Sequence, residues 1–394
     1  HGAAGGAHRH LGGLASRWSP GKLLMTMLTA SPSGAVLNHT PPELTASNLS
    51  CGYPRSRRLV LRDLDLEMRR GRFFCIIGPN GGGKTTLLRT LAGLLPPVSG
   101  TVRIGGTPLH ALAARERARR LSVVLTQFTA PGYLSVERFV ELGRHPYTGF
   151  LARLSSEDRR AVGDALDQTG IAALRHRWMA EISDGERQRA AVARALAQAA
   201  DVMILDEPTA FLDVAGRATV MSTLRRIAHS TDRLIVTSSH DVELVLRTAD
   251  VVALIGVNGT LRLGSPEDLV LSGAIQALFP ADTLSFDART GTFRLPAPTG
   301  TPVRLVGEGL VAEWTAHAIE RVGRPVIRPA ATDGGGSAGG GGPTGAGEGR
   351  HDGTATKTPT VTVHEGDRPA WSVGIGTESG TVHSLETLVE VLRE

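Results

Sequence analysis

One segment limits the possible folds of this chain more than any other, the glycine-rich run Gly78–Thr85. An apolar run, Phe73–Ile77, precedes it, and an apolar helical pattern ending near Gly93 follows it. Strand, glycine loop and helix in this order predict an anion-binding nest of backbone N–H groups at a helix N-terminus. The run fits the pattern G-x-x-x-x-G-K-[ST] in full: Gly78, Pro79, Asn80, Gly81, Gly82, Gly83, Lys84, Thr85.

Lys84 and Thr85 at the end of the loop predict which ligand it binds. Lys84 is expected to reach the β- and γ-phosphates of a nucleotide, and the Thr85 hydroxyl to hold Mg²⁺. Lysine occurs at only three positions in the chain, 22, 84 and 357, so arginine supplies nearly all of the positive charge. A compact ammonium suits a phosphate pocket better than a planar guanidinium, which strengthens the prediction.

The wider pattern predicts an α/β fold with one nucleotide-binding domain over residues 43–280. Apolar runs typical of strands covered on both faces alternate there with helical patterns. A helical insert is expected over Ser155–Gly170, where Asp158 follows Ser155 by three residues. The expected buried strands are Phe73–Ile77, Val202–Leu205, Leu234–Ser238 and Val251–Ile255.

The two ends of the chain differ from this domain. Residues 1–42 are rich in Gly and Ala and are expected to form a disordered N-terminal extension, with Met25 or Met27 as a native start. Residues 281–394 are expected to form a small accessory α/β region, with a hairpin around Thr290 and Gly291, helices over 310–322 and 385–392, and a Gly-rich linker over 333–353. The alternative is a poorly ordered extension without a role of its own.

Composition excludes several classes of function. The net charge is only +5 and no dense basic block occurs, which argues against nucleic-acid binding. Cys51 and Cys75 are too few for a disulfide framework and lack neighbours spaced for zinc. No apolar run approaches the length of a membrane span, so a membrane connection would have to come through a partner.

A second run with chemical potential, Val202–Glu207, is an apolar strand that ends in two carboxylates. Asp206 at the strand end is suited to hold Mg²⁺, and Glu207 to polarise an attacking water. Such a string alone is a weak signal. Its position after a phosphate loop makes it specific.

Several motifs in a fixed order resemble the ATPases of ABC transporters across about the middle 60% of the chain. Ile182–Glu186, followed by Arg187, Gln188 and Arg189, resembles the signature motif, and Asp206–Asp213 resembles the second nucleotide motif with its D-loop. Gln127 resembles the Q-loop glutamine, His240 the switch histidine and Tyr53 the aromatic that stacks on adenine.

The resemblance implies a mechanism and assigns roles. Two copies would meet head to tail, with each ATP between one phosphate loop and the other copy's signature. The catalytic residues would be Glu207 as general base, His240 on the γ-phosphate, and Gln127. Mg²⁺ would be held by Thr85, Gln127 and Asp206. Besides the phosphate loop and Tyr53, nucleotide contacts would come from Thr86, Ser183, Asp184, Gly185, Glu186 and Asp213.

The signature departs from the commonest form of the family. Asp184 stands where a glycine is usual and Glu186 where a glutamine is usual. Because a carboxylate beside phosphate is unfavourable, we expect Asp184 to point away or to pair with an arginine. The signature sequence, together with Glu141–Tyr147, resembles that of the branch that imports iron(III)–siderophore complexes, with vitamin B12 and haem as alternative cargoes.

The resemblance also implies partners. The chain would lie at the cytoplasmic face of the cell membrane under separate permease subunits, pair with a second copy, and depend indirectly on an extracytoplasmic substrate-binding protein. An exporter ATPase or a non-transport ABC protein, for instance one of translation or DNA repair, remains an alternative. A single set of motifs without a long coiled-coil insertion argues against the non-transport class.

Overall fold

The computed structural model describes residues 43–53, 58–126, 132–149, 153–210, 212–279, 284–329, 358–366, 368–375 and 378–393. It divides into two compact units. The first runs to His240 and includes Thr248–Leu261; the second comprises Asp241–Arg247 and Arg262–Glu394. None of the helices in these described ranges has both the length and the apolar character needed to span a bilayer.

The centre of the first unit is a run of parallel strands in the order β9-β3-β8-β7-β6. All five residues of β3 are buried, as are all of β7 and β8, which explains why their sequences are apolar throughout. The four strands predicted from the sequence are confirmed at their predicted bounds. The strands are β3 (Phe73–Ile77), β6 (Leu121–Val124), β7 (Val202–Leu205), β8 (Leu234–Ser238) and β9 (Val251–Ile255).

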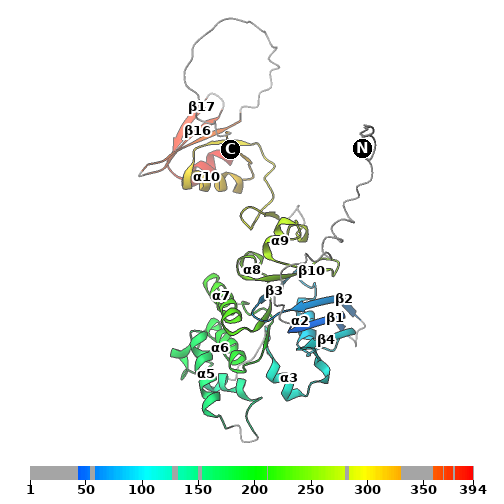
Figure 1. Ribbon diagram of the computed structural model, residues 1–394. Helices are drawn as coiled ribbons and strands as arrows, with labels where there is room; N and C mark the ends of the chain where they lie inside the picture. The colour runs from blue at the N-terminus through cyan, green and yellow to red at the C-terminus, as the bar shows by residue number, and fades with distance from the viewer. Residues whose placement is uncertain are drawn as a thin grey trace, which may run out of the picture. The chain divides into compact units, whose positions relative to one another are not determined.

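A four-stranded antiparallel sheet of order β2-β1-β4-β5 forms a second layer of this unit. Its buried side chains share one core with helix α2 and with the central strands. In Figure 1 this blue sheet lies across α2 from the green helices α5 and α6. The elements are β1 (Leu44–Tyr53), β2 (Arg58–Met68), β4 (Ser99–Ile104), β5 (Thr107–Pro108) and α2 (Lys84–Leu91).

A helical part stands between β6 and β7 in the chain. The predicted helical insert is confirmed: Ser155 and Asp158 form a capping box at the start of α5. Arg144 follows α4 and donates a hydrogen bond to Asp158 Oδ1 at 2.7 Å, and both side chains are buried. Besides α2, the helices of this unit are α3 (Ala114–Arg120), α4 (Val136–Glu141), α5 (Ser156–Gln168), α6 (Asp184–Ala197) and α7 (Val214–Thr231).

The second unit has a core of its own, in which Trp371, Leu305 and Ile319 are buried together. Its main sheet has the order β14-β13-β15-β16-β17, and the indole N–H of Trp371 donates to Thr315 Oγ1 at 2.7 Å. The strands are β10 (Leu261–Gly264), β11 (Ser285–Asp287), β12 (Thr292–Arg294), β13 (Val303–Val306), β14 (Val326–Ile327), β15 (Thr360–His364), β16 (Ala370–Ile375) and β17 (Glu378–Val382). The helices are α8 (Val242–Thr248), which the unit boundary divides, α9 (Pro266–Leu271), α10 (Gly309–Arg321) and α11 (Leu385–Arg393).

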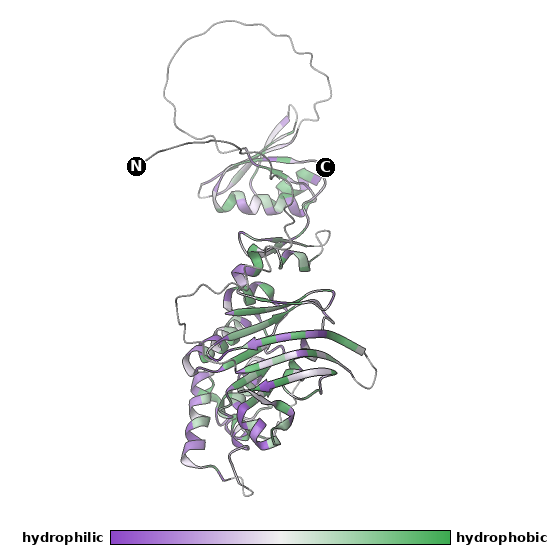
Figure 2. Ribbon diagram, turned by 45° about the vertical axis from the view of Figure 1, so that its right-hand side comes forward, coloured by the Kyte–Doolittle hydropathy of each residue, from purple (hydrophilic) through white to green (hydrophobic). Residues whose placement is uncertain are grey.

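Several sequence expectations concern this unit. The hairpin predicted around Thr290 and Gly291 is confirmed by the antiparallel pairing of β11 with β12. The helices predicted over 310–322 and 385–392 are confirmed as α10 and α11. Figure 2 colours apolar residues green, and they occur on the strands and on the helices of both units. The expectations for residues 1–42 and 333–353 lie outside the described residues.

Candidate functional site

The glycine loop connects the buried strand β3 to the N-terminus of α2. The ammonium of Lys84 donates hydrogen bonds to Gly78 O at 2.9 Å and to Pro79 O at 3.1 Å. Burial lowers the pKa of Lys84, and the nearby carboxylates of Glu207 and Asp206 oppose that shift. The only lysine of the first unit's described residues is therefore folded back on its own loop, where a phosphate would provide a stronger partner.

Two glycines of the loop occupy positions that a side chain cannot share. Gly83 has φ +102°, and a Cβ there would lie 2.6 Å from Val60 Cγ1. A Cβ at Gly78 would lie 2.7 Å from Ile255 O. The glycine pattern thus keeps the backbone close to the neighbouring strands, in a conformation suited to present N–H groups to an anion.

The carboxylate-bearing end of β7 lies beside the start of α2. The Thr85 hydroxyl donates to Asp206 Oδ1 at 3.1 Å. Asp206 is 3% exposed, and its backbone carbonyl accepts a hydrogen bond from Thr126 Oγ1 at 2.8 Å. A hydroxyl and a carboxylate in contact are the hard oxygen ligands that Mg²⁺ prefers, so the residues present fit a magnesium ion.

Ser238, the last residue of β8, contacts both members of the acidic pair. Its hydroxyl donates to Asp206 Oδ1 at 2.9 Å and accepts a hydrogen bond from the Glu207 backbone N–H at 2.9 Å. Glu207 itself has φ +49°, a left-handed conformation that is uncommon for a residue other than glycine. Sequence reasoning missed Ser238. The local signal was its position at the end of the predicted strand Leu234–Ser238, which does not specify its contact with Asp206.

Glu207 and His240 contact each other directly. His240 Nε2 and Glu207 Oε1 form a hydrogen-bonded pair, and the imidazole is about half exposed while the carboxylate is more buried. The two side chains assigned to catalysis by resemblance therefore meet across the C-terminal ends of β7 and β8, where ligands bind in open α/β sheets.

One cavity of about 460 Å³ joins these features. Tyr53 lies at its wall, and the tyrosine hydroxyl accepts a weak hydrogen bond from Thr86 Oγ1 at 3.4 Å. Val60, which sequence reasoning missed because it is one apolar residue of a long strand, lines the cavity as well. The lining residues are Tyr53, Val60, Asn80, Gly81, Gly83, Lys84, Thr85, Thr86, Glu207 and His240.

The signature segment forms the N-terminus of α6. Ser183 is the N-cap: its hydroxyl accepts from the Glu186 N–H at 3.3 Å, and Glu186 Oε2 accepts from the Ser183 N–H at 2.8 Å. The hydrogen bond from the Ser183 backbone, ahead of the other contributions, lowers the pKa of the Glu186 carboxyl. Glutamate in place of the usual glutamine therefore completes a capping box.

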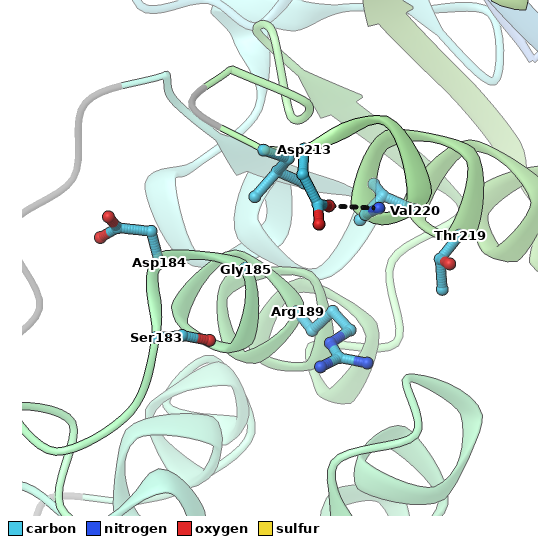
Figure 3. A pocket seen from close by; sticks show the side chains of 9 residues that line it. Ser183, Asp184, Gly185, Arg189, Asp213, Thr219 and Val220 are labelled. Atoms are coloured by element: carbon cyan, nitrogen blue, oxygen red, sulfur yellow. Dashed lines mark hydrogen bonds between the residues drawn. The ribbon is translucent and has the colours of Figure 1, made fainter.

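Asp184 pairs with Arg187, as expected for a carboxylate placed beside an anion site. Figure 3 shows the Asp184 carboxylate at the edge of the cavity that the signature lines, directed away from Asp213 and Val220. Asp213 caps α7 across this second cavity and accepts from the Gly216 N–H at 2.7 Å. The lining residues are Ser183, Asp184, Gly185, Arg189, Leu212, Asp213, Gly216, Thr219 and Val220.

The predicted site residues thus separate into two groups. Tyr53, the glycine-loop residues, Thr86, Asp206, Glu207 and His240 come together around the first cavity. Ser183, Asp184, Gly185 and Asp213 line the second cavity, which shares no lining residue with the first. Glu186 lines neither cavity and forms the capping box with Ser183. Gln127 lies outside the described residues, so its role stays a prediction.

Comparison with known proteins agrees with this geometry. The family profile described as ABC transporter matches residues 61–210. An uncharacterized ABC transporter ATP-binding protein of Methanocaldococcus jannaschii is 38% identical over 64% of this chain and 86% of its own length. A cobalamin import ATP-binding protein of Halobacterium salinarum is 37% identical over 64% of each chain, less than two thirds of that relative.

Two further similarities come from a sequence and a solved structure. The ferric enterobactin transport ATP-binding protein of Escherichia coli is 32% identical over 65% of this chain and 94% of its own. An inward-facing ABC transporter, provisionally assigned to the metal-chelate type, superposes with a TM-score of 0.53 at 28% identity. It covers 60% of this chain and 89% of the compared chain. The chain therefore belongs to the ABC transporter family of ATP-binding proteins and is an ATPase.

Proposed function

We propose that this ATPase is the energy-coupling subunit of an ABC importer that takes up iron(III)–siderophore complexes. The observation that carries the catalytic part is the convergence of Lys84, Thr85, Asp206, Glu207 and His240 at one end of a parallel sheet. The assignment of the cargo rests on relatives whose names specify ferric enterobactin and cobalamin import, and on the sequences of the signature and of Glu141–Tyr147.

The reaction is hydrolysis of ATP to ADP and phosphate. Tyr53 stacks on the adenine at one wall of the cavity, and the glycine loop holds the phosphates through backbone N–H groups. Lys84 leaves the carbonyls of Gly78 and Pro79 for the β- and γ-phosphates. Glu207 accepts the proton of the attacking water, and His240 exchanges its contact with Glu207 for one with the γ-phosphate.

Thr85 and Asp206, with Gln127 by prediction, would hold Mg²⁺. Bound there, the ion supplies positive charge that neutralises the phosphate oxygens as the terminal bond breaks. The contribution of the chain is to hold its oxygen ligands in contact before the nucleotide arrives, as the 3.1 Å distance between Thr85 Oγ1 and Asp206 Oδ1 indicates.

A head-to-tail dimer of two copies completes each site in this proposal. The signature residues Ser183–Gly185 line a cavity that shares no residue with the cavity of the glycine loop. Within one copy the signature therefore does not line the nucleotide cavity, which supports a role on the nucleotide of the second copy. The backbone N–H groups of Asp184 and Gly185, in the first turn of α6, are suited to receive its γ-phosphate.

The permease is proposed to dock on the helical part of the first unit at the cytoplasmic face of the membrane. Two large aromatic side chains are exposed there, Tyr133 at 77% and Trp178 at 50%. The segments that carry them are adjacent, because Met179 N donates to Leu134 O at 2.9 Å and Ser135 forms a bridge with Trp178. Exposed aromatic side chains favour a protein–protein contact. An extracytoplasmic substrate-binding protein would act through the permease alone.

Uptake assays separate the iron–siderophore cargo from cobalamin, whose import is named for a relative at 37% identity. The proposal is tested by uptake of radiolabelled iron–siderophore into cells that lack this protein. We expect uptake to fail, to return with the unmodified chain, and not to return with Glu207→Gln. Normal iron uptake together with lost uptake of labelled vitamin B12 or haem would move the assignment to that cargo.

Residues 281–394 are proposed to form an accessory region, with 43–280 as the ATPase domain. The buried cluster around Trp371, Leu305 and Ile319 supports a separate core in this region. A chain that ends at residue 280 is expected to bind ATP with unchanged affinity. Complete insolubility of that truncated chain would instead assign the region to the ATPase core.

A further inference from the structure

We infer that Ser238 is a positioning residue for ATP hydrolysis, which sets both acidic side chains of the site through one hydroxyl. The inference rests on the proposed roles of Asp206 at the metal and Glu207 at the attacking water. Ser238 is the last residue of β8 and is 0% exposed. Buried polar groups are nearly always hydrogen-bonded, and here both the donor and the acceptor capacity of the hydroxyl are used.

The first of its two contacts is with the metal-binding carboxylate. Ser238 Oγ donates to Asp206 Oδ1 at 2.9 Å, and the same oxygen accepts from Thr85 Oγ1 at 3.1 Å. Two donors from two different elements thus converge on one carboxylate oxygen. That arrangement fixes the rotation of the carboxylate about its Cβ–Cγ bond, because each donor defines one direction of approach.

The second contact is with the backbone of the catalytic glutamate. The Glu207 N–H donates to Ser238 Oγ at 2.9 Å, and Glu207 has φ +49°. A left-handed residue at a functional site persists only where its surroundings hold it. The hydroxyl of Ser238 supplies such a restraint, and it therefore helps to aim the Glu207 side chain toward His240.

The role of this hydroxyl is to couple the two acidic positions. Loss of the donor frees the Asp206 carboxylate to rotate, and loss of the acceptor frees the peptide before Glu207. Both changes displace groups by fractions of an ångström in the cavity where the water must attack, and misplacement of about 1 Å costs on the order of a hundredfold in rate. ATP binding, which relies on the glycine loop and Tyr53, is left largely intact.

Three substitutions at two neighbouring positions separate positioning from general damage. Ser238→Ala removes the hydroxyl, and Ser238→Thr keeps it. Thr237→Val is the matched control, since Thr237 is the adjacent 0% exposed hydroxyl of β8 and its side chain faces the opposite side of the strand. Steady-state ATP hydrolysis, ATP affinity, and Mn²⁺ affinity measured by EPR with a non-hydrolysable nucleotide are compared in the full chain.

We expect Ser238→Ala to lower kcat about tenfold to a hundredfold with KM for ATP within about twofold. It should also weaken Mn²⁺ binding and speed hydrogen exchange at the Glu207 N–H of the nucleotide-free protein. Ser238→Thr should recover most of the rate, and Thr237→Val should keep it. If Ser238→Ala fails to fold, Ser238→Cys, which retains the size with a weaker donor, is expected to show the same loss of kcat.

The proposal is overturned if Ser238→Ala, or a folded Ser238→Cys in its place, hydrolyses ATP at the unmodified rate. It is equally overturned if Thr237→Val loses as much activity, because general core damage would then explain both. Glu207→Gln distinguishes this failure from failure of the proposed site. If Glu207→Gln is inactive while Ser238→Ala is normal, only the inference about Ser238 is wrong.

Discussion

The Thr85 hydroxyl and the Asp206 carboxylate lie 3.1 Å apart, although 121 positions of sequence separate them. Thr85 lies in the first turn of α2, after the glycine loop, and Asp206 directly follows β7. Because β7 and β3 both run toward the same edge of the sheet, their following residues meet there. The two positions proposed to hold Mg²⁺ are therefore brought together by the fold itself, before any nucleotide binds.

The first prediction concerns the cation of the glycine loop. Lys84→Ala removes the ammonium that donates to Gly78 O and Pro79 O and would bind the phosphates. We expect ATP affinity to fall at least about a hundredfold, since a charge-assisted contact to phosphate contributes about 1.5–3 kcal/mol for each hydrogen bond. Isothermal titration calorimetry checks this. Unchanged affinity would remove the loop from the nucleotide site.

The second prediction concerns the base of the nucleotide. Tyr53→Ala is expected to weaken ATP binding about tenfold, because aromatic stacking contributes about 0.5–1.5 kcal/mol. Tyr53→Phe is the matched control and should bind ATP nearly as tightly, since it keeps the stacking ring and removes only the hydroxyl that contacts Thr86 at 3.4 Å. Fluorescence titration with a labelled nucleotide measures both. Equal loss in the two variants would show that the hydroxyl, and not the ring, is what matters.

The third prediction concerns the cap of α6. Glu186→Ala removes the carboxylate that accepts from the Ser183 N–H, and we expect the free energy of unfolding to fall by about 1 kcal/mol. Since the pKa of Glu186 is below its ordinary value, this stabilisation is full above pH 4.5 and is lost as the pH falls through the lower folded value. Urea unfolding at pH 7 and pH 3 checks it; a difference between the variants that grows toward pH 3 would contradict it.

The fourth prediction concerns the buried ion pair of the helical part. Arg144 donates to Asp158 Oδ1 at 2.7 Å and to Ala197 O at 2.8 Å, and Tyr147 lies 3.9 Å over its guanidinium. Arg144→Ala leaves a buried carboxylate unpaired and is expected to cost about 3–5 kcal/mol in thermal or denaturant unfolding. The double variant Arg144→Met with Asp158→Leu should cost less than Arg144→Ala alone. A larger cost for the double variant would show that packing, not charge, decides.

This pair also has a defined pH dependence. Burial alone would raise the pKa of Asp158, but hydrogen bonds from Ser155 and from Arg144 together lower it. The stabilisation by Asp158 is therefore present above pH 3.8 and is lost as the pH falls through the lower folded pKa. The segment Glu141–Tyr147, whose sequence resembles one branch of the transporter family, thus includes an arginine with a structural role.

The fold and the first cavity followed largely from the sequence, because their signals are local. An apolar run, a glycine loop and a helix stand next to each other in the chain, and the strands Phe73–Ile77 and Val202–Leu205 appear at their predicted bounds. The spacing of three residues between Ser155 and Asp158 likewise predicts the start of α5. Patterns of this kind are decided by backbone geometry within one element.

The contacts that the sequence did not reveal depend on register between distant strands. Ser238 meets Asp206 only because β8 lies next to β7, with Leu205 opposite Thr237. Val60 lines the cavity only because β2 approaches Gly83. The pairing of Glu207 with His240 arises in the same way from two strand ends 33 positions apart. Nothing within a single segment specifies such neighbours.

The most direct test of the central claim is ATP turnover by purified Glu207→Gln, measured beside its ATP affinity and its oligomeric state. The account predicts near-normal ATP affinity, hydrolysis reduced by about a hundredfold or more because the general base is gone, and an ATP-dependent dimer. Glu181→Gln, an exposed carboxylate two residues before Ser183, serves as the control and should hydrolyse ATP normally. Normal turnover by Glu207→Gln would contradict the account, because a residue other than Glu207 would then activate the water.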